Sequence, residues 1–313
     1  MAEVAGALDR LRREEERLAT RTSVVNLVVV SSDPEAAERT RCAMRRLGHR
    51  HPGRTLALVL QHDQHDHIDA SVELHQVQAD GRTIWWEEVV LSVGGRVCRH
   101  LDSLVSPLLL HELPVVAWYP SELPARDDPL AASAQALLVD ARWAGEQEGG
   151  AHRAIPALVG LSRRRVIVDL SWKRLMPWRH LLAELFEPEL LRPFVEGVRS
   201  VEVTAHDGPA HLLAGWLMDR LGVPSAAITL RVTRHAAVRV VAEYRGQRAT
   251  FTVARPTDAR LVLARVDLDG TLHTRRLATL PEHGLSWSLA EALSHLERDP
   301  VYEHALHAAL GLG

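Results

Sequence analysis

The stretch VVNLVVVSSDPEAAERTRCAMRRLG, residues 24–48, decides the fold class. Its first seven residues form an apolar, valine-rich run, which is typical of a buried β-strand. Asp33 and Pro34 then suit the N-cap and first turn of a helix, and Gly48 is a helix-ending signal. A buried strand that leads directly into a helix predicts a mixed α/β fold.

Strands and helices alternate along the rest of the chain. Further single strands are expected at residues 55–60, 114–119, 166–170, 198–204 and 226–232. Hairpins with glycine-containing turns are expected at residues 70–93, 237–253 and 261–277. The apolar spacing predicts helices at residues 96–110, 177–186, 212–221, 286–296 and 300–310.

The length of 313 residues and the hydrophobic content of 46% are enough for two domains with their own cores. A stretch rich in Gly, Glu and Gln at residues 145–150 marks the boundary. We expect an amphipathic helical arm over 1–20, an N-terminal α/β domain over 21–150 and a C-terminal α/β domain over 151–313. Both domains show the order strand, helix, strand, hairpin, helix, which suggests a degenerate duplication. The arm packs on its own domain or against a partner subunit.

Composition excludes several classes of protein. The formal net charge of −3 gives no basic excess, so neither nucleic acid nor an anionic membrane is expected as a partner. Cys42 and Cys98 are too few for a disulfide framework or a zinc site, which fits a reducing cytoplasm. No signal peptide is visible, and no apolar run approaches the roughly 18 residues that a membrane helix needs. A folded cytoplasmic protein is expected.

Signatures of catalysis are missing from the sequence. It contains no glycine-rich dinucleotide loop, no phosphate-binding loop with its lysine and no helical pair of zinc-binding histidines. Gly160-Leu161-Ser162 begins like a nucleophile elbow, but Arg163 follows where the tight turn needs a small residue. We therefore expect a protein that is not an enzyme, without a catalytic residue, cofactor or metal ligand.

The loop HDQHDH at residues 62–67 offers three imidazoles and two carboxylates, which could bind a transition metal. Metal sites normally draw their ligands from separate rigid elements with supporting hydrogen bonds. A solvated loop is therefore the favoured interpretation, and metal binding is the alternative.

A cationic corner is expected where the helix that ends near Gly48 leads into the next strand. His51 and Arg54 could bind a phosphate or an acidic partner surface there, or they could cover the carbonyl groups at the helix end. Arg21 precedes the first strand, so it joins the same edge if the two strands are neighbours.

The segment DLSWKRLMPWR, residues 169–179, combines tryptophan and arginine, the side chains that most often dominate interface energies. Pro177 suits the first position of a helix, and the helical phase then places Trp178 in the core. Trp172 would lie before that helix, in an exposed loop. The candidates for partner binding in this segment are Trp172, Lys173, Arg174 and Arg179.

Motifs in order along nearly the whole chain resemble the OpcA family. They are RTSVVNL at 21–27, RHPGR at 50–54, SPLLL at 106–110, LPVVAW at 113–118, DLSWKR at 169–174 with Trp178-Arg179, LAGWL at 213–217 and Val301-Tyr302. The sequence departs from the family at Gly53, where a serine is common, and at His111-Glu112, where a Pro-Asp pair is frequent.

The OpcA family consists of glucose-6-phosphate dehydrogenase assembly proteins. The resemblance implies a non-catalytic subunit that binds this dehydrogenase, favours its active oligomer and raises its activity in the oxidative pentose phosphate pathway. We expect Trp172 and Arg174 to contact the dehydrogenase, with Arg21, Arg54 and Arg179 next. The alternative is a sugar-phosphate sensor or cryptic enzyme that holds phosphate with Arg21, His51 and Arg54.

Overall fold

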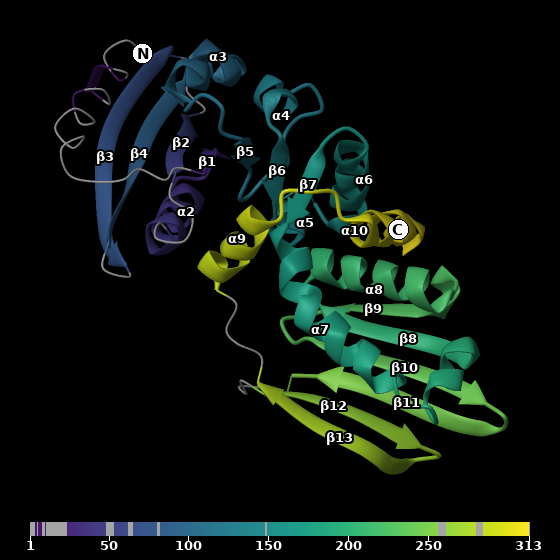
Figure 1. The fold of residues 1–313 in the computed structure, drawn as a ribbon. Helices are drawn as coiled ribbons and strands as arrows, with labels where there is room; N and C mark the ends of the chain where they lie inside the picture. Colours follow the sequence, from purple (N-terminus) through teal and green to yellow (C-terminus); the bar gives the residue numbers. More distant parts are fainter. Residues whose placement is uncertain are drawn as a thin grey trace. The chain divides into compact units, whose positions relative to one another are not determined.

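The computed structural model describes residues 24–47, 53–61, 65–79, 82–147, 149–255, 261–279 and 284–312, with positions 4, 6, 7 and 10 (Figure 1). The protein is mixed α/β with two sheets, as the sequence predicts. Its contacts define two compact units, each assembled from separate segments of the chain. Unit 1 comprises residues 1–140, 164–168 and 284–298, and unit 2 comprises residues 141–163, 169–283 and 299–313. The domain ranges 21–150 and 151–313 stay a prediction, and most of the arm lies outside the described residues.

Unit 1 is built on a seven-stranded sheet in the order β3-β4-β2-β1-β5-β6-β7. Its strands are β1 (Val25–Ser31), β2 (Gly53–Gln61), β3 (His67–Ala79), β4 (Arg82–Gly94), β5 (Val115–Trp118), β6 (Ala136–Val139) and β7 (Val166–Asp169). The central strand β1 pairs in parallel with β2 and β5, and every residue of β1 is buried. Parallel strands covered on both faces need continuous apolar runs, which explains the valine-rich opening of this strand.

The helix α2 (Pro34–Leu47) follows β1 as the sequence predicts. The carboxylate of Asp33 accepts a hydrogen bond from the backbone N–H of Glu35 at 2.8 Å, so Asp33 caps this helix. The buried side chain of Asn26 in β1 donates to the carbonyl of Leu110 at 2.9 Å and accepts from its N–H at 2.8 Å. A buried amide with both functions satisfied fixes the segment before β5 against β1.

The single helix expected over 96–110 is wrong. The chain instead forms η1 (Gly95–Arg99), α3 (Leu101–Val105) and η2 (Ser106–Leu108), because His100 leaves helical geometry at φ −130° and ψ 41°. Residues 145–147 of the expected boundary belong to the helix α5 (Ala141–Gln147), and the helix α6 (Ala151–Ser162) begins directly after the boundary. The strand β6 and the helices α4 (Pro129–Ser133), α5 and α6 were not predicted from the sequence. The helix α9 (Leu285–Ser294) packs against α2 in unit 1.

Unit 2 contains a six-stranded sheet in the order β13-β12-β11-β10-β8-β9. Its strands are β8 (Val198–Ala205), β9 (Ile228–Val232), β10 (Ala237–Tyr244), β11 (Gln247–Ala254), β12 (Leu261–Leu268) and β13 (Thr271–Thr279). The helices α7 (Leu170–Phe186) and α8 (Asp207–Leu221) lie against the sheet, and α10 (Pro300–Ala309) packs on α8 (Figure 1). The short 3-10 helices η3 (Arg192–Gly197), η4 (Ser225–Ala227) and η5 (Leu310–Leu312) complete this unit.

The inferred duplication is wrong, although both halves begin with the same element order. In the first sheet, the hairpin of β3 and β4 joins the sheet through β4, which pairs in parallel with β2. In the second sheet, the hairpin of β10 and β11 joins through β10, which pairs antiparallel with β8. Equal order along the chain therefore leads to different sheets. No helix among the described residues is long and apolar enough to cross a membrane.

Candidate functional site

The helix α7 begins at Leu170, seven residues before the predicted start at Pro177. The carboxylate of Asp169 accepts a hydrogen bond from the N–H of Ser171 at 2.8 Å and so supplies the N-cap. Pro177 consequently lies inside the helix. Lys173 and Arg174 belong to the first turns of α7 rather than to a loop, and both are half-buried.

Trp172 is buried, with a relative exposure of only 2%, so the prediction of an exposed anchor is wrong. Its indole Nε1 donates a hydrogen bond of 2.7 Å to Asp299, and its ring lies 5.6 Å from the ring of Tyr302. The guanidinium of Arg179 stacks over the same indole at 3.5 Å from the ring centroid. Trp172 is thus enclosed by partners from its own unit. Trp178 is buried at 8%, which confirms its predicted place in the core.

Two helix caps are joined through these aromatic side chains. Asp299 caps α10 by accepting hydrogen bonds from the N–H groups of Val301 at 2.9 Å and Tyr302 at 3.1 Å. The hydroxyl of Tyr302 donates to Asp169 at 3.1 Å, and Asp169 caps α7. Burial, with the two carboxylates nearby, raises the pKa of Tyr302 well above its ordinary value, so the hydroxyl keeps its proton. The motifs at 169–174 and 301–302 are therefore one structural cluster.

Arg179 is held inside unit 2 as well. Burial lowers the pKa of its guanidinium to about 10, and the nearby Arg220 acts in the same direction while Asp299 opposes both. Its buried Nε has no hydrogen-bond partner among the described residues. The cation is consequently positioned by the indole of Trp172, and direct contact with a partner would require it to leave that ring.

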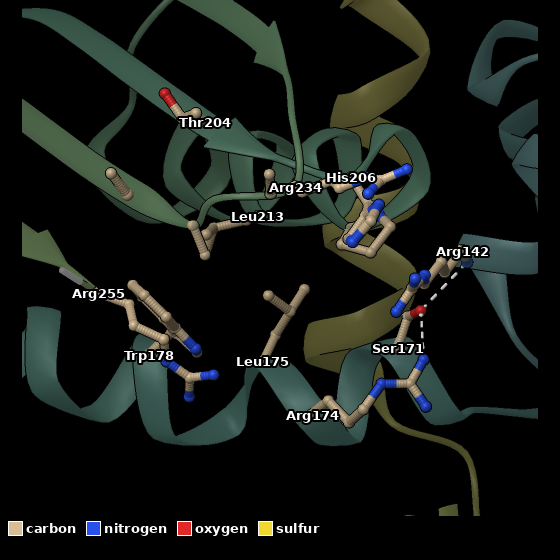
Figure 2. A pocket seen from close by; sticks show the side chains of 14 residues that line it. Arg142, Ser171, Arg174, Leu175, Trp178, Thr204, His206, Leu213, Arg234 and Arg255 are labelled. Carbon is tan, nitrogen blue, oxygen red and sulfur yellow. Dashed lines mark hydrogen bonds between the residues drawn. The ribbon is translucent and has the colours of Figure 1, made fainter. Parts of the chain in front are cut away.

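A cavity of about 270 Å³ opens beside α7, where β8 ends and α8 begins (Figure 2). Its polar lining comes from five separate elements or loops and consists of the four arginines Arg142, Arg174, Arg234 and Arg255 with the imidazole of His206. Apolar side chains from α7 and α8 form part of the wall, namely Leu175, Trp178 and Leu213. The cavity therefore combines several positive groups with an apolar surface, a combination suited to a small anionic molecule.

Ser171 organises one side of the cavity. Its hydroxyl accepts hydrogen bonds from the backbone N–H of Arg142 at 3.1 Å and from Nη2 of Arg174 at 3.0 Å (Figure 2). These contacts connect the start of α5 with the first turn of α7. The guanidinium of Arg174 is thereby held at the cavity rim.

The charges around the cavity are unbalanced. None of the described residues that line it is acidic, and the carboxylate of Glu146 lies nearby, 3.7 Å from Nε of Arg142 and 4.0 Å from Nδ1 of His206. Arg234 and Arg255 form no ion pair with any residue that the structure describes. Burial, followed by the charge of Arg142, lowers the pKa of His206. Such an arrangement can bind an anion through charge-assisted hydrogen bonds.

The cationic corner around Arg54 is already occupied. Arg54 is 3% exposed, its Nε donates to Glu87 at 2.7 Å and its Nη1 donates to the carbonyl of Leu108. The strands that flank this corner are neighbours, with Asn26 opposite Arg54. Arg21 and His51 lie outside the described residues. Arg54 is thus committed to a buried ion pair, and binding of phosphate or a partner by its guanidinium would require that pair to open.

The histidine loop is described only from His65 onward. Asp66 accepts hydrogen bonds from the backbone N–H of Arg96 at 2.7 Å and from its Nε at 2.8 Å, and these bonds lower the pKa of Asp66. His62 lies outside the described residues. The carboxylate of Asp66 is thus engaged by an arginine rather than free for a metal.

A cluster that was not predicted from the sequence lies on the hairpin of β3 and β4. Possible metal-ligand atoms of Glu73, His75 and Glu88 lie within 4.8 Å of one another. Glu88 is nearly fully buried and also pairs with Arg41 at 2.5 Å and Arg45 at 3.4 Å. Burial acts to raise its pKa, but the hydrogen bonds from Arg41 and His75 outweigh burial and lower it. Because two arginines neutralise this carboxylate, the cluster is an ion-pair network, which the cross-strand register of the hairpin could have indicated.

Comparison with protein families gives matches in both halves of the chain. A family model described as the glucose-6-phosphate dehydrogenase subunit N-terminal domain matches residues 44–155, and one described as its C-terminal domain matches residues 165–306. The chain belongs to the OpcA family. The order of the two domain models agrees with the order of the motifs at 50–54, 169–174 and 213–217.

Curated relatives carry the same family name. An OxPP cycle protein OpcA from Nostoc punctiforme is 28% identical over 186 residues, covering 55% of this chain and 38% of the relative. The OpcA protein of Synechocystis is 26% identical over 141 residues, covering 43% of this chain and 29% of the relative. The chain thus spans less than two fifths of the length of these OpcA relatives.

A solved structure of glucose-6-phosphate 1-dehydrogenase from Mycobacterium avium aligns with 91% of this chain and 91% of its own. The sequence identity is 11% and the TM-score is 0.48. This similarity is too low to establish a shared fold.

Proposed function

We propose that this chain is a non-catalytic assembly factor that binds glucose-6-phosphate dehydrogenase, favours its active oligomer and thereby raises its activity. The observation that carries the proposal is the pair of family matches, which assigns both halves of the chain to domains of a dehydrogenase subunit. The names of the curated relatives, which refer to the OxPP cycle, support the same role.

The physical requirement for such activation is a difference in binding. A factor that binds active and inactive oligomers equally well shifts no equilibrium, however tightly it binds. A tenfold preference for the active oligomer corresponds to about 1.4 kcal/mol. That free energy must come from contacts made with the active oligomer alone. The extent of activation should therefore saturate at a level set by this preference.

Lys173 is the contact residue that we place first, because it is partly exposed on α7. Arg174 is also partly exposed, but it lines the cavity and binds Ser171. Trp172 and Arg179 support this part of α7 from within the unit. Arg21 and His51 stay proposed contacts. For Arg54, the ion pair with Glu87 supports a role in holding β2 against β4.

Affinity capture tests this proposal directly. The tagged full chain should retain the dehydrogenase of the same organism from a purified mixture, and Lys173→Glu should weaken that capture about tenfold. Arg248→Glu is a charge-matched control on β11, an exposed position in the same unit. Failure of the wild-type chain to retain the enzyme would refute the function. Equal loss of capture with both variants would refute only the role of Lys173.

A further inference from the structure

We propose that the arginine-lined cavity of unit 2 binds a small phosphate monoester. This inference goes beyond the proposed assembly function, because it assigns a ligand to the chain itself. The site consists of Arg142, Arg174, Arg234 and Arg255 around the turn between β8 and α8.

The four arginines that line this cavity point to an anionic ligand. Like charges around a partly enclosed space raise the free energy of the empty site, and a bound anion offsets this repulsion. Arg234 and Arg255 have no carboxylate partner among the described residues, whereas the exposed Arg231 on β9 pairs with Glu202 and Arg265 on β12 with Asp267. The two cavity arginines therefore retain donors for a ligand.

The position of the cavity adds a second source of positive potential. The 15-residue helix α8 begins at Asp207, and its N-cap residue His206 makes no capping hydrogen bond through its side chain. The partial positive charge of a helix N-terminus favours anions, and this end of α8 borders the cavity through His206 and Pro209. The carboxylate of Asp207 is turned to the N–H of Ala151 at 2.7 Å and does not line the cavity.

Size and polarity restrict the ligand to a small ester. A volume of about 270 Å³ exceeds the space that inorganic phosphate needs, and it lies just below the usual range for small-molecule sites. Leu175, Trp178 and Leu213 provide apolar wall beside the cations, where the carbon skeleton of an ester can lie. A terminal phosphate has three oxygens for several guanidinium groups at once, whereas a carboxylate has two.

Isothermal titration calorimetry on the full chain in a buffer free of phosphate and sulfate tests the proposal. The probes are glucose 6-phosphate, glycerol 3-phosphate, inorganic phosphate and the uncharged sugar glucose. At least one of the two esters should bind with one site per chain and more tightly than inorganic phosphate. Glucose should give no binding heat, and added NaCl should lower the affinity for the ester because salt screens the charges.

Variants locate the binding site. Arg234→Gln and Arg255→Gln should each weaken ester binding about tenfold or more, because each removes charge-assisted hydrogen bonds. Arg239→Gln, an exposed arginine of β10 that does not line this cavity, should leave binding unchanged. Circular dichroism establishes that the variants are folded.

Three outcomes would overturn the proposal. The first is the absence of binding heat with both esters, and the second is equal affinity for inorganic phosphate and the esters. The third is ester binding that neither Arg234→Gln nor Arg255→Gln weakens. If neither ester gives binding heat while the two variants reduce capture of the dehydrogenase, the cavity binds an acidic group of the partner instead. Since the calorimetry uses the chain alone, its result is independent of the assembly function.

Discussion

Trp172 and Asp299 are 127 positions apart in the sequence, yet the indole Nε1 donates a 2.7 Å hydrogen bond to the carboxylate. The same carboxylate caps α10 through Val301 and Tyr302. One aspartate thus caps the N-terminus of a helix and accepts the hydrogen bond of a buried indole N–H. The start of α7 and the start of α10 are consequently stabilised together.

This relationship predicts that Trp172 acts through stability. Trp172→Ala should lower the free energy of unfolding by about 3–5 kcal/mol, since it empties a large buried volume and removes the indole donor from Oδ2 of Asp299. The milder Trp172→Phe should lose about 1–3 kcal/mol and remain folded. Urea denaturation measures both values. His180→Ala, at an exposed position of α7, should stay within about 0.5 kcal/mol. A Trp172→Ala protein as stable as wild type would show that the indole is not buried.

Two helical glycines of unit 2 should respond in opposite directions to alanine. A Cβ atom on Gly215 in α8 would lie 2.1 Å from the carbonyl oxygen of Ala305 in α10, so the helices would have to separate. Gly215→Ala should therefore lower the free energy of unfolding by about 1–3 kcal/mol. Gly160 in α6 has open space at the same position, and Gly160→Ala should raise it by about 0.5–1 kcal/mol. Thermal denaturation of the two variants makes the comparison. A Gly215→Ala protein at least as stable as the wild type would contradict the close contact between α8 and α10.

The ion-pair network of unit 1 predicts a dependence of stability on pH. Glu88 has a lowered pKa in the folded protein, so its ionised form stabilises the fold above the ordinary carboxylate value of about 4.3. This stabilisation is lost as the pH falls through the folded pKa. Glu88→Gln should lower the free energy of unfolding by about 1–3 kcal/mol at pH 7, and the difference from wild type should shrink in acid.

The matched control for Glu88 is Glu35→Gln, because the side chain of Glu35 is 88% exposed. Its unfolding curves should coincide with those of the wild type at both pH values. A destabilisation by Glu88→Gln that persists undiminished at pH 3 would contradict the assigned ionisation.

Long apolar strands and capped helices could be predicted from the sequence because local interactions determine them. The run before Asp33 and the cap at Asp33 led to β1 and α2 with nearly correct ends. The short strand β6 could not be recognised in this way, since four residues give no periodicity. The start of α7 was predicted wrongly because it depends on a tertiary contact. Asp169 caps the helix and also accepts a hydrogen bond from the hydroxyl of Tyr302, and these contacts outweigh the start signal of Pro177.

The cavity could not be predicted, because its arginines come from segments far apart in the sequence. Arg142 belongs to α5, Arg174 to α7, and Arg234 and Arg255 flank β10 and β11. None forms a local motif with another. The strand-to-helix turn at 204–209 was the one local signal, since such turns bring a helix N-terminus to the end of a strand.

The most direct test of the assembly role follows both the oligomer and the activity of the dehydrogenase. Mass photometry and rate measurements on the dehydrogenase of the same organism should be made while this full chain is titrated. The assembly role predicts that the larger complex and the rate rise together and saturate at one stoichiometry. An unchanged oligomer distribution and an unchanged rate at saturating amounts of the chain would contradict it.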